Sequence, residues 1–195
     1  MALESLQELY LEQLRDLHSA ERQIIAALPK MVKAAKHPEL RQAFESHLNQ
    51  TKAHLQRLEQ VAKRTGQELS GHKCEGMEGL LKEGARTMEE RADSDVLDAA
   101  LIASAQRVEH YEMAGYGCAR TYARLLGLDD DVRLLQQTLD EEGQTDHLLT
   151  NLAEITINPD ALTGDREVRR SASADVGSRS STTSRNKRGE SETTA

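Results

Sequence analysis

Large apolar residues recur three or four positions apart through most of the first 160 residues. This spacing puts them on one face of an α-helix, which repeats every ~3.6 residues. No segment shows the strict alternation of apolar and polar residues that is typical of a half-buried strand. The pattern predicts four long helices, at about residues 3–35, 38–65, 94–126 and 129–157, and a shorter amphipathic helix at about 77–91.

Turn and cap residues support these boundaries. Pro38 suits the first turn of the second long helix, where a backbone N–H would have no partner in any case. Gly66 and Gly127 suit helix C-termini, because glycine readily adopts the left-handed conformation. Ser94 is the predicted N-cap of the third long helix, and Pro159 is expected to end the fourth.

The lengths of the connections predict how the helices are arranged. A short link joins the first long helix to the second, and another joins the third to the fourth, so each pair should form an antiparallel hairpin. The stretch between the hairpins is long enough to cross the length of a bundle. The expected fold class is therefore all-α: a ferritin-like four-helix bundle of two antiparallel helical hairpins, with a short helix in the long crossover.

The composition fits a soluble helical protein, because 30% of the 195 residues are charged and the mean hydropathy is −0.65. No window approaches the ~18 apolar residues of a membrane span, and acidic residues throughout the first 30 positions rule out a secretory signal. Cys74 and Cys118 lack zinc-site spacing, which favours a reducing compartment over a single disulfide. We therefore expect a cytoplasmic protein.

Charge and sequence complexity divide the chain into two parts. Residues 161–195 are dominated by Ser, Thr, Arg and Gly, so they are predicted to form a disordered tail after a helical bundle of residues 1–160. Residues 164–195 carry seven Lys/Arg and five Asp/Glu, which leaves a net charge of −10 on the first 163. Such an acidic body argues against nucleic-acid binding, which needs a positive surface.

Each long helix carries polar residues in its apolar stripe. In the first helix, Glu21 lies seven positions from both Leu14 and Leu28, and therefore on the same face. His110 directly follows Glu109, and His147 directly follows Asp146. One residue turns a side chain by ~100°, so both histidines are expected near the surface. The candidates found in this way are Glu21 on the first helix, Gln50 and His54 on the second, Glu109 and Glu112 on the third, and Glu142 and Asp146 on the fourth.

Buried carboxylates need compensation, because an unpaired buried charge costs several kcal/mol. The five candidate acids total −5, and His54 can offset only one of these charges. Two divalent ions supply +4 and two trivalent ions +6, so a dinuclear metal site balances the charge where salt bridges do not. Taken singly, each residue has an ordinary alternative, since a helical Glu is commonly exposed and an inward His is commonly hydrogen-bonded in a core. The coincidence across four helices favours the metal site.

At these residues the sequence resembles the YciF/YciE family of bacterial stress proteins, a ferritin-like group. The similarity runs over about residues 4–158 and includes the stretches LRDLHSAERQIIAALPKMVKAA, RVEHYEMAGYG and LLQQTLDEEGQTDHLLTNLAE. The resemblance implies a four-helix bundle with a dinuclear carboxylate site for two iron ions, and a homodimer. Carried onto this sequence, the pattern of related bundles gives as ligands Glu21, His54, Glu109, Glu112, Glu142 and Asp146.

The second long helix departs from the pattern that the resemblance implies. The resemblance implies Glu-Glu-Thr, which family members usually carry, where this chain has Asn49, Gln50 and Thr51. A Gln carbonyl can ligate a hard cation, but it carries no charge and does not bridge two metals as a carboxylate does. Binding of the second metal ion therefore depends on whether Gln50 can replace an acid.

Two functions remain open from the sequence. The first is a stress-response protein whose di-iron or di-manganese site reacts with dioxygen or peroxide, as a ferroxidase, peroxidase or catalase. Tyr111 and Tyr116 could supply a hydrogen bond or a radical to it, or could pack in the core. The second is a non-enzymatic helical dimer that protects cells by binding a partner, with a structural or degenerate metal site. Iron storage in a hollow shell and DNA protection fit the acidic body and the tail less well.

Overall fold

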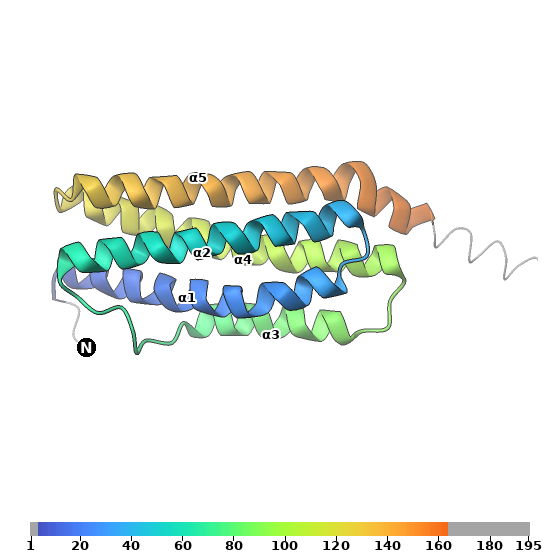
Figure 1. The fold of residues 1–195 in the computed structure, drawn as a ribbon, viewed down its shortest axis with the longest axis horizontal. Helices are drawn as coiled ribbons and strands as arrows, with labels where there is room; N and C mark the ends of the chain where they lie inside the picture. The colour runs from blue at the N-terminus through green and yellow to red at the C-terminus, as the bar shows by residue number, and fades with distance from the viewer. Residues whose placement is uncertain (1–3, 164–195) are drawn as a thin grey trace, which may run out of the picture.

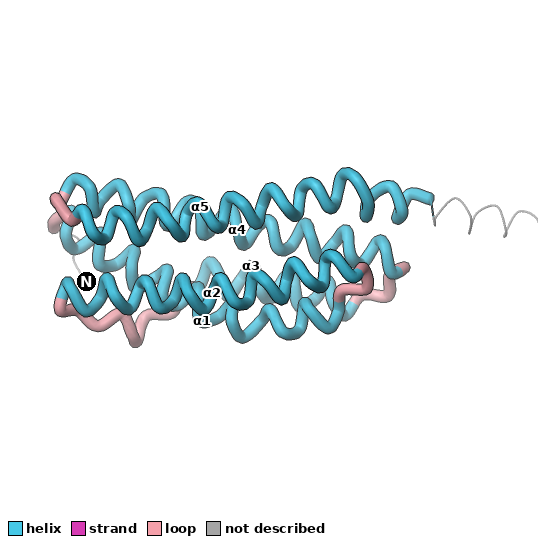
Figure 2. The backbone as a smooth tube through the Cα atoms, turned by 45° about the horizontal axis from the view of Figure 1, so that its top comes forward, coloured by secondary structure: helices cyan, strands magenta, loops and turns pink. Residues whose placement is uncertain are grey.

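The computed structural model describes residues 4–163, which form an elongated helical bundle (Figure 1). α1 and α2 make one antiparallel hairpin, α4 and α5 make the other, and α3 lies along α1 and α4. The short connections lie at the ends of the bundle, whereas the loop between α2 and α3 returns along its side (Figure 2). The predicted all-α, ferritin-like bundle is confirmed. Its helices are α1 (Leu6–Ala34), α2 (Pro38–Thr65), α3 (Glu75–Glu89), α4 (Ser94–Leu125) and α5 (Asp129–Leu152).

Local sequence determines where the helices begin and end. Ser5 Oγ accepts a hydrogen bond from the Glu8 N–H (3.2 Å) at the start of α1. Pro38 is the first residue of α2, as predicted. Gly66 ends α2 at φ +65°, in the left-handed region where a residue with a Cβ would be strained.

Two predicted boundaries are wrong by one or two residues. The N-cap of α4 is Asp93 and not Ser94, because the Asp93 carboxylate accepts a hydrogen bond from the Asp95 N–H (3.1 Å). Both residue types are good caps, so the sequence alone did not distinguish these neighbours. The crossover helix α3 begins at Glu75, two residues earlier than predicted, because the Cys74 thiol accepts from the Met77 N–H (3.3 Å) and caps it.

The expectation that Pro159 ends the fourth long helix is also wrong. A π-helical turn (Ala153–Ile157) follows α5, and helical chain continues to residue 163. A proline ring crowds the carbonyl four residues earlier, and the wider π-turn directly before Pro159 relieves this crowding. The bundle therefore extends past the predicted boundary at residue 160, and the predicted tail from residue 164 onward lies outside the described residues.

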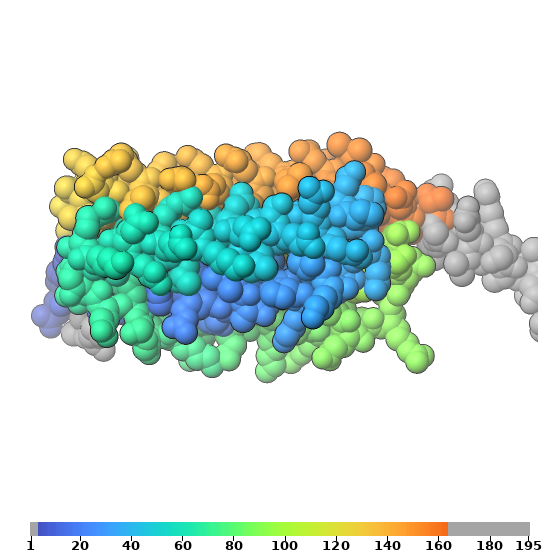
Figure 3. Space-filling model, in the orientation of Figure 1, coloured from blue at the N-terminus to red at the C-terminus, as the bar shows by residue number. Residues whose placement is uncertain are grey.

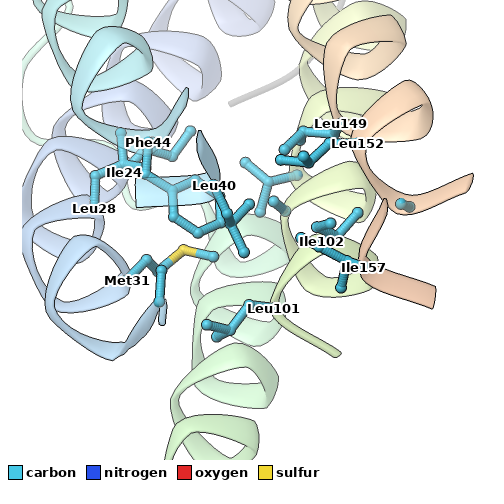
Figure 4. Packing of buried hydrophobic residues seen from close by; sticks show 14 of the residues in the cluster. Ile24, Leu28, Met31, Leu40, Phe44, Leu101, Ile102, Leu149, Leu152 and Ile157 are labelled. Atoms are coloured by element: carbon cyan, nitrogen blue, oxygen red, sulfur yellow. The ribbon is translucent and has the colours of Figure 1, made fainter. Parts of the chain in front are cut away.

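The core consists of two apolar clusters with a polar layer between them. One cluster, toward the α1–α2 turn, includes Ile24, Phe44 and Leu149, which approach one another from α1, α2 and α5 (Figure 4). The other, toward the α4–α5 turn, includes Leu14 and Leu58. The residues between these clusters are polar and yet buried, which marks this layer as the part of the bundle that needs a chemical explanation.

Two further predictions concern the free cysteines and the absence of a membrane-spanning helix. Cys74 is buried, Cys118 is exposed, and neither forms a disulfide, as predicted. Within residues 4–163, no helix combines the length and the apolar character needed to cross a membrane.

Candidate metal centre

Six buried side chains from all four long helices meet in the polar layer, and we call them the six-residue centre. None of these residues is more than 3% exposed. On the face shown in Figure 3, α2 and α5 lie side by side and cover the middle of the bundle. The residues of the centre are Glu21 from α1, His47 and His54 from α2, Glu109 and Glu112 from α4, and Glu142 from α5.

The donor atoms of the six-residue centre form two groups. The first contains His47, Glu109, Glu112 and Glu142, and the second contains Glu21, His54 and Glu142. Within each group the donor atoms lie within 4.8 Å of one another. Glu142 belongs to both groups, so its carboxylate lies where a ligand shared by two metal ions would be.

Helical periodicity explains how the sequence builds this arrangement. His47 and His54 are seven residues apart on α2, and Glu109 and Glu112 are three apart on α4, so both pairs face the same way. Because the four helices run side by side, these faces meet at the same height in the bundle.

The two ring nitrogens of His54 face different partners. Nδ1 faces carboxylates of the six-residue centre, and Nε2 faces the Glu141–Arg57 ion pair outside it. Its Nδ1 lies 2.9 Å from Glu142 Oε1 and 3.5 Å from Glu21 Oε1, although neither contact has hydrogen-bond geometry. Its Nε2 is hydrogen-bonded to Glu141 Oε2 (2.9 Å), and Arg57 donates to both Glu141 oxygens at 2.8 Å. An ionised carboxylate can only accept, so Glu141 keeps a proton on Nε2, and Nδ1 is the nitrogen that would bind a metal.

His47 occupies the equivalent place in the other group. Its Nε2 lies 3.3 Å from Glu109 Oε1, and its Nδ1 lies 3.4 Å from Thr145 Oγ1. Burial lowers the pKa of His47, which favours the neutral imidazole, the form that binds metals.

The centre contains most of the unpartnered polar atoms in the described part of the chain. Within residues 4–163, nine buried side-chain N or O atoms lack a hydrogen-bond partner, and all but one of them belong to the six-residue centre. Both oxygens of Glu112 and of Glu142 are among them. Each such atom costs ~1–3 kcal/mol if nothing compensates it. Four carboxylates and two imidazoles are donors that suit iron and manganese, so the residues present fit a dinuclear metal site.

Without metal, protons and one ion pair hold the centre near neutrality. Burial, together with the nearby Glu142 carboxylate, raises the pKa of Glu109 and of Glu112 well above the usual range. Burial also raises the pKa of Glu21, to about 7, although its contacts with His54 oppose the increase. Burial lowers the pKa of His54, but its contacts with Glu142 and Glu21 outweigh this and raise it to about 10. The same His54 contact lowers the pKa of Glu142 despite burial. These are sites where metal cations can replace protons.

Two of the predicted ligands lie beside the six-residue centre. Asp146 belongs to neither donor group; its Oδ1 accepts from Gln106 Nε2 (3.0 Å) and lies 3.3 Å from His110 Nε2. Gln50 is half-buried, and its Oε1 lies 3.5 Å from the Thr145 hydroxyl. The other predicted ligands, Glu21, His54, Glu109, Glu112 and Glu142, come together.

The sequence reasoning missed His47 as a candidate ligand. Its spacing of seven residues from His54 was a usable signal, because it places both imidazoles on one face of α2. Tyr116 donates a hydrogen bond to Glu21 Oε1, one of the roles considered for it. Tyr111 is turned away from the centre: its hydroxyl donates to Asp16 (2.7 Å) and lies 3.0 Å from the Cys74 thiol.

The chain matches a known family over nearly all of its described length. The model of a family described as a domain of unknown function, DUF892, matches residues 5–162. Protein YciF of Escherichia coli (strain K12) is 40% identical over 162 residues, which are 83% of this chain and 98% of that protein.

Solved structures share the fold. The crystal structure of the E. coli stress protein YciF aligns with a TM-score of 0.77 at 40% identity and covers 80% of this chain and 98% of that chain. YcfI of Rhodopseudomonas palustris, provisionally described as a structural protein, aligns with a TM-score of 0.74 at 45% identity and covers 76% and 94% of the two chains.

Proposed function

Since this chain belongs to the DUF892 family, with E. coli YciF among its relatives, we propose that it is a stress-response protein with a reactive dinuclear metal centre. The six-residue centre would hold two iron ions, or two manganese ions, and would react with dioxygen or peroxide. The observation that supports this proposal is the convergence of unpartnered buried donor atoms from four helices on one point. The free thiols of Cys74 and Cys118 are consistent with the cytoplasmic location that we also propose.

The two donor groups suggest how the ligands would be divided. Glu21 and His54 would hold one metal ion, and His47, Glu109 and Glu112 the other, with Glu142 shared between them. Two adjacent redox-active ions supply, when bound, the two electrons that reduction of dioxygen to peroxide or of peroxide to water requires.

Residues around the centre orient the ligands and control protons. Glu141 fixes the tautomer of His54. The Tyr116 hydroxyl donates a hydrogen bond to Glu21 Oε1 and so holds this carboxylate in position. Gln50, through Thr145, orients His47, and we assign it this role in place of metal ligation. The apolar clusters on both sides keep bulk water out.

Iron(II) oxidation tests the proposed function. Metal-free protein is loaded with iron(II) under argon and then given dioxygen or hydrogen peroxide, and oxidant consumption is followed against iron(II) in buffer alone. We expect consumption above that background in the wild type and in Glu154→Ala, an exposed control. Glu112→Ala should lose it. A wild-type protein that accelerates neither reaction would contradict the proposed function.

A second candidate function is a non-enzymatic helical dimer that gives stress protection by binding a partner, and one surface feature favours the dimer. Leu148, Ile155 and Leu162 are spaced seven apart along α5 and the helical chain after it, and each is more than half exposed. Apolar side chains repeated on one helical face are typical of helix–helix contacts. The mass in solution tests this: the dimer predicts twice 21.7 kDa, whereas a mass of 21.7 kDa in the wild type would rule it out.

A further inference from the structure

A small cavity adjoins the six-residue centre on its His47 side. The space open to the centre of a water-sized sphere is about 20 Å³, so the cavity has room for one small molecule or atom. The walls include Ile24 from α1, Phe44 from α2, Val108 from α4 and Leu149 from α5, so the cavity opens into the apolar cluster of Figure 4.

The cavity connects this apolar cluster directly to the candidate metal ligands. His47 and Glu109 form part of its lining, and His47 Nε2 and Glu109 Oε2 are among the atoms without a hydrogen-bond partner. Thr145 also lines it, but the single proton of its hydroxyl is already directed to Gln50 Oε1 (3.5 Å) or to the Glu141 carbonyl (3.2 Å). The surface that the cavity offers to a guest is almost wholly carbon.

The chemistry of this lining distinguishes between guests. A buried water needs about three hydrogen-bond partners. Once His47 and Glu109 bind metal, the rest of the lining does not provide them. Hydrogen peroxide has two O–H groups, and leaving water without replacement hydrogen bonds costs several kcal/mol. Dioxygen is apolar and diatomic, so it loses no strong hydrogen bonds when it leaves water.

We propose that this cavity binds dioxygen, and not peroxide, next to His47 and Glu109, and so supplies dioxygen to the six-residue centre. This inference rests on the proposed function and makes it more specific. The residues that determine selectivity are those that keep the cavity open and apolar, above all the small side chains Ala43 and Ala105.

Variants that fill the cavity test whether it binds dioxygen, and a control variant shows whether any change comes from folding instead. Ala105→Val adds two methyl groups to the lining from α4, and Ala43→Val does the same from α2, so each variant checks the other if one folds poorly. Ala114→Val is the matched control, because Ala114 is an exposed residue of α4 outside the cavity lining.

Xenon binding tests the cavity without any metal or turnover. Xenon is an apolar probe of empty apolar cavities, and methyl NMR of the metal-free protein reports where it binds. We expect saturable shifts at the methyl groups of Ile24 and Leu149 in the wild type and in Ala114→Val, and at least fivefold weaker shifts in the two filled variants. No shifts in the wild type, or the same shifts in the filled variants, would overturn the proposed binding site.

A comparison of two oxidants tests the selectivity. In the reaction with dioxygen, two bound iron(II) ions would supply one electron each and water would supply two protons, so that one O₂ would leave as hydrogen peroxide. We expect the filled variants to slow iron(II) oxidation by dioxygen at least fivefold while oxidation by added peroxide keeps its wild-type rate. Equal slowing with both oxidants, or with neither, would overturn the inference. A wild-type protein that reacts with neither oxidant would instead contradict the proposed function, and the xenon result would still stand.

Discussion

Glu141 and Glu142 are adjacent on α5, and their different surroundings give them different tasks. A step of one residue turns a side chain by ~100°, so Glu142 faces the centre while Glu141 faces Arg57. The Arg57 contact keeps the pKa of the Glu141 carboxyl below its usual value, against the effect of burial, and the charged group can then hold His54. The inward carboxylate is available for metal, and the outward one positions its neighbour.

Removing the charge of Glu141 should weaken metal binding without removing a ligand. In Glu141→Gln the amide is a weaker acceptor for His54 Nε2–H, and such outer contacts typically change metal affinity 10–100-fold. Competition with a chelator measures the affinity for manganese(II). Asp140→Asn is the control, because it removes the same charge from an exposed position of α5. Equal losses of affinity in both variants would show that surface charge, and not the contact with His54, causes the effect.

The metal-free protein should become less stable as the pH rises from 7 to 9. Burial raises the pKa of Glu109 and Glu112 well above the usual range, and contacts with Glu142 and Glu21, against burial, raise that of His54 to about 10. In this window the folded protein keeps protons that the unfolded chain has released, so by linkage the free energy of unfolding falls with increasing pH.

Urea unfolding at pH 7, 8 and 9 measures this slope, once in chelator and once with manganese(II). Bound metal displaces the protons, so the loaded protein should show a flat or rising profile. Glu109→Gln combined with Glu112→Gln should reduce the slope in chelator. A metal-free protein whose stability increases over this range would contradict the assignment of protons to the centre.

At the scale of elements, the spacing of apolar residues along the chain predicted most of the helical structure. It located the four long helices and brought Glu21, Glu109 and Glu142 to one layer, because residues seven apart share a face. The spacing did not show that His47 belongs to the donor groups and that Asp146 does not. Asp146 lies ~40° around α5 from Glu142, and its contact with Gln106 depends on how α4 and α5 pack, which spacing within one helix does not reveal.

The contact between α3 and α4 depends on the absence of a side chain at Gly76. A Cβ there would lie 2.8 Å from Tyr111 Cε2, so the ring would have to move away from Cys74 and Asp16. Gly76→Ala should therefore lower the free energy of unfolding by about 1–2 kcal/mol. Gly79→Ala, three residues along α3 with nothing within 4 Å, should raise it by about 0.5–1 kcal/mol. Urea unfolding of both variants checks this, and the same change in both would contradict the packing account.

At the scale of the whole molecule, the bundle is two apolar cores joined by a polar layer that is costly to bury. Hydrophobic clusters on either side of the six-residue centre stabilise the helices, and the centre interrupts them with four carboxylates. A bundle selected for stability alone would fill this layer with apolar side chains, since replacing buried charges by well-packed apolar groups is often stabilising. The metal ions that we propose would offset the cost of burying this layer.

The metal content of the purified protein tests this claim most directly. Iron and manganese per chain are measured by mass spectrometry after expression with both metals supplied. The two donor groups predict about two metal ions per chain in the wild type and in the exposed control Glu154→Ala. Glu142→Ala, which removes the shared carboxylate, should bind close to none. A wild type without metal above background, or a Glu142→Ala variant with the wild-type content, would contradict the account.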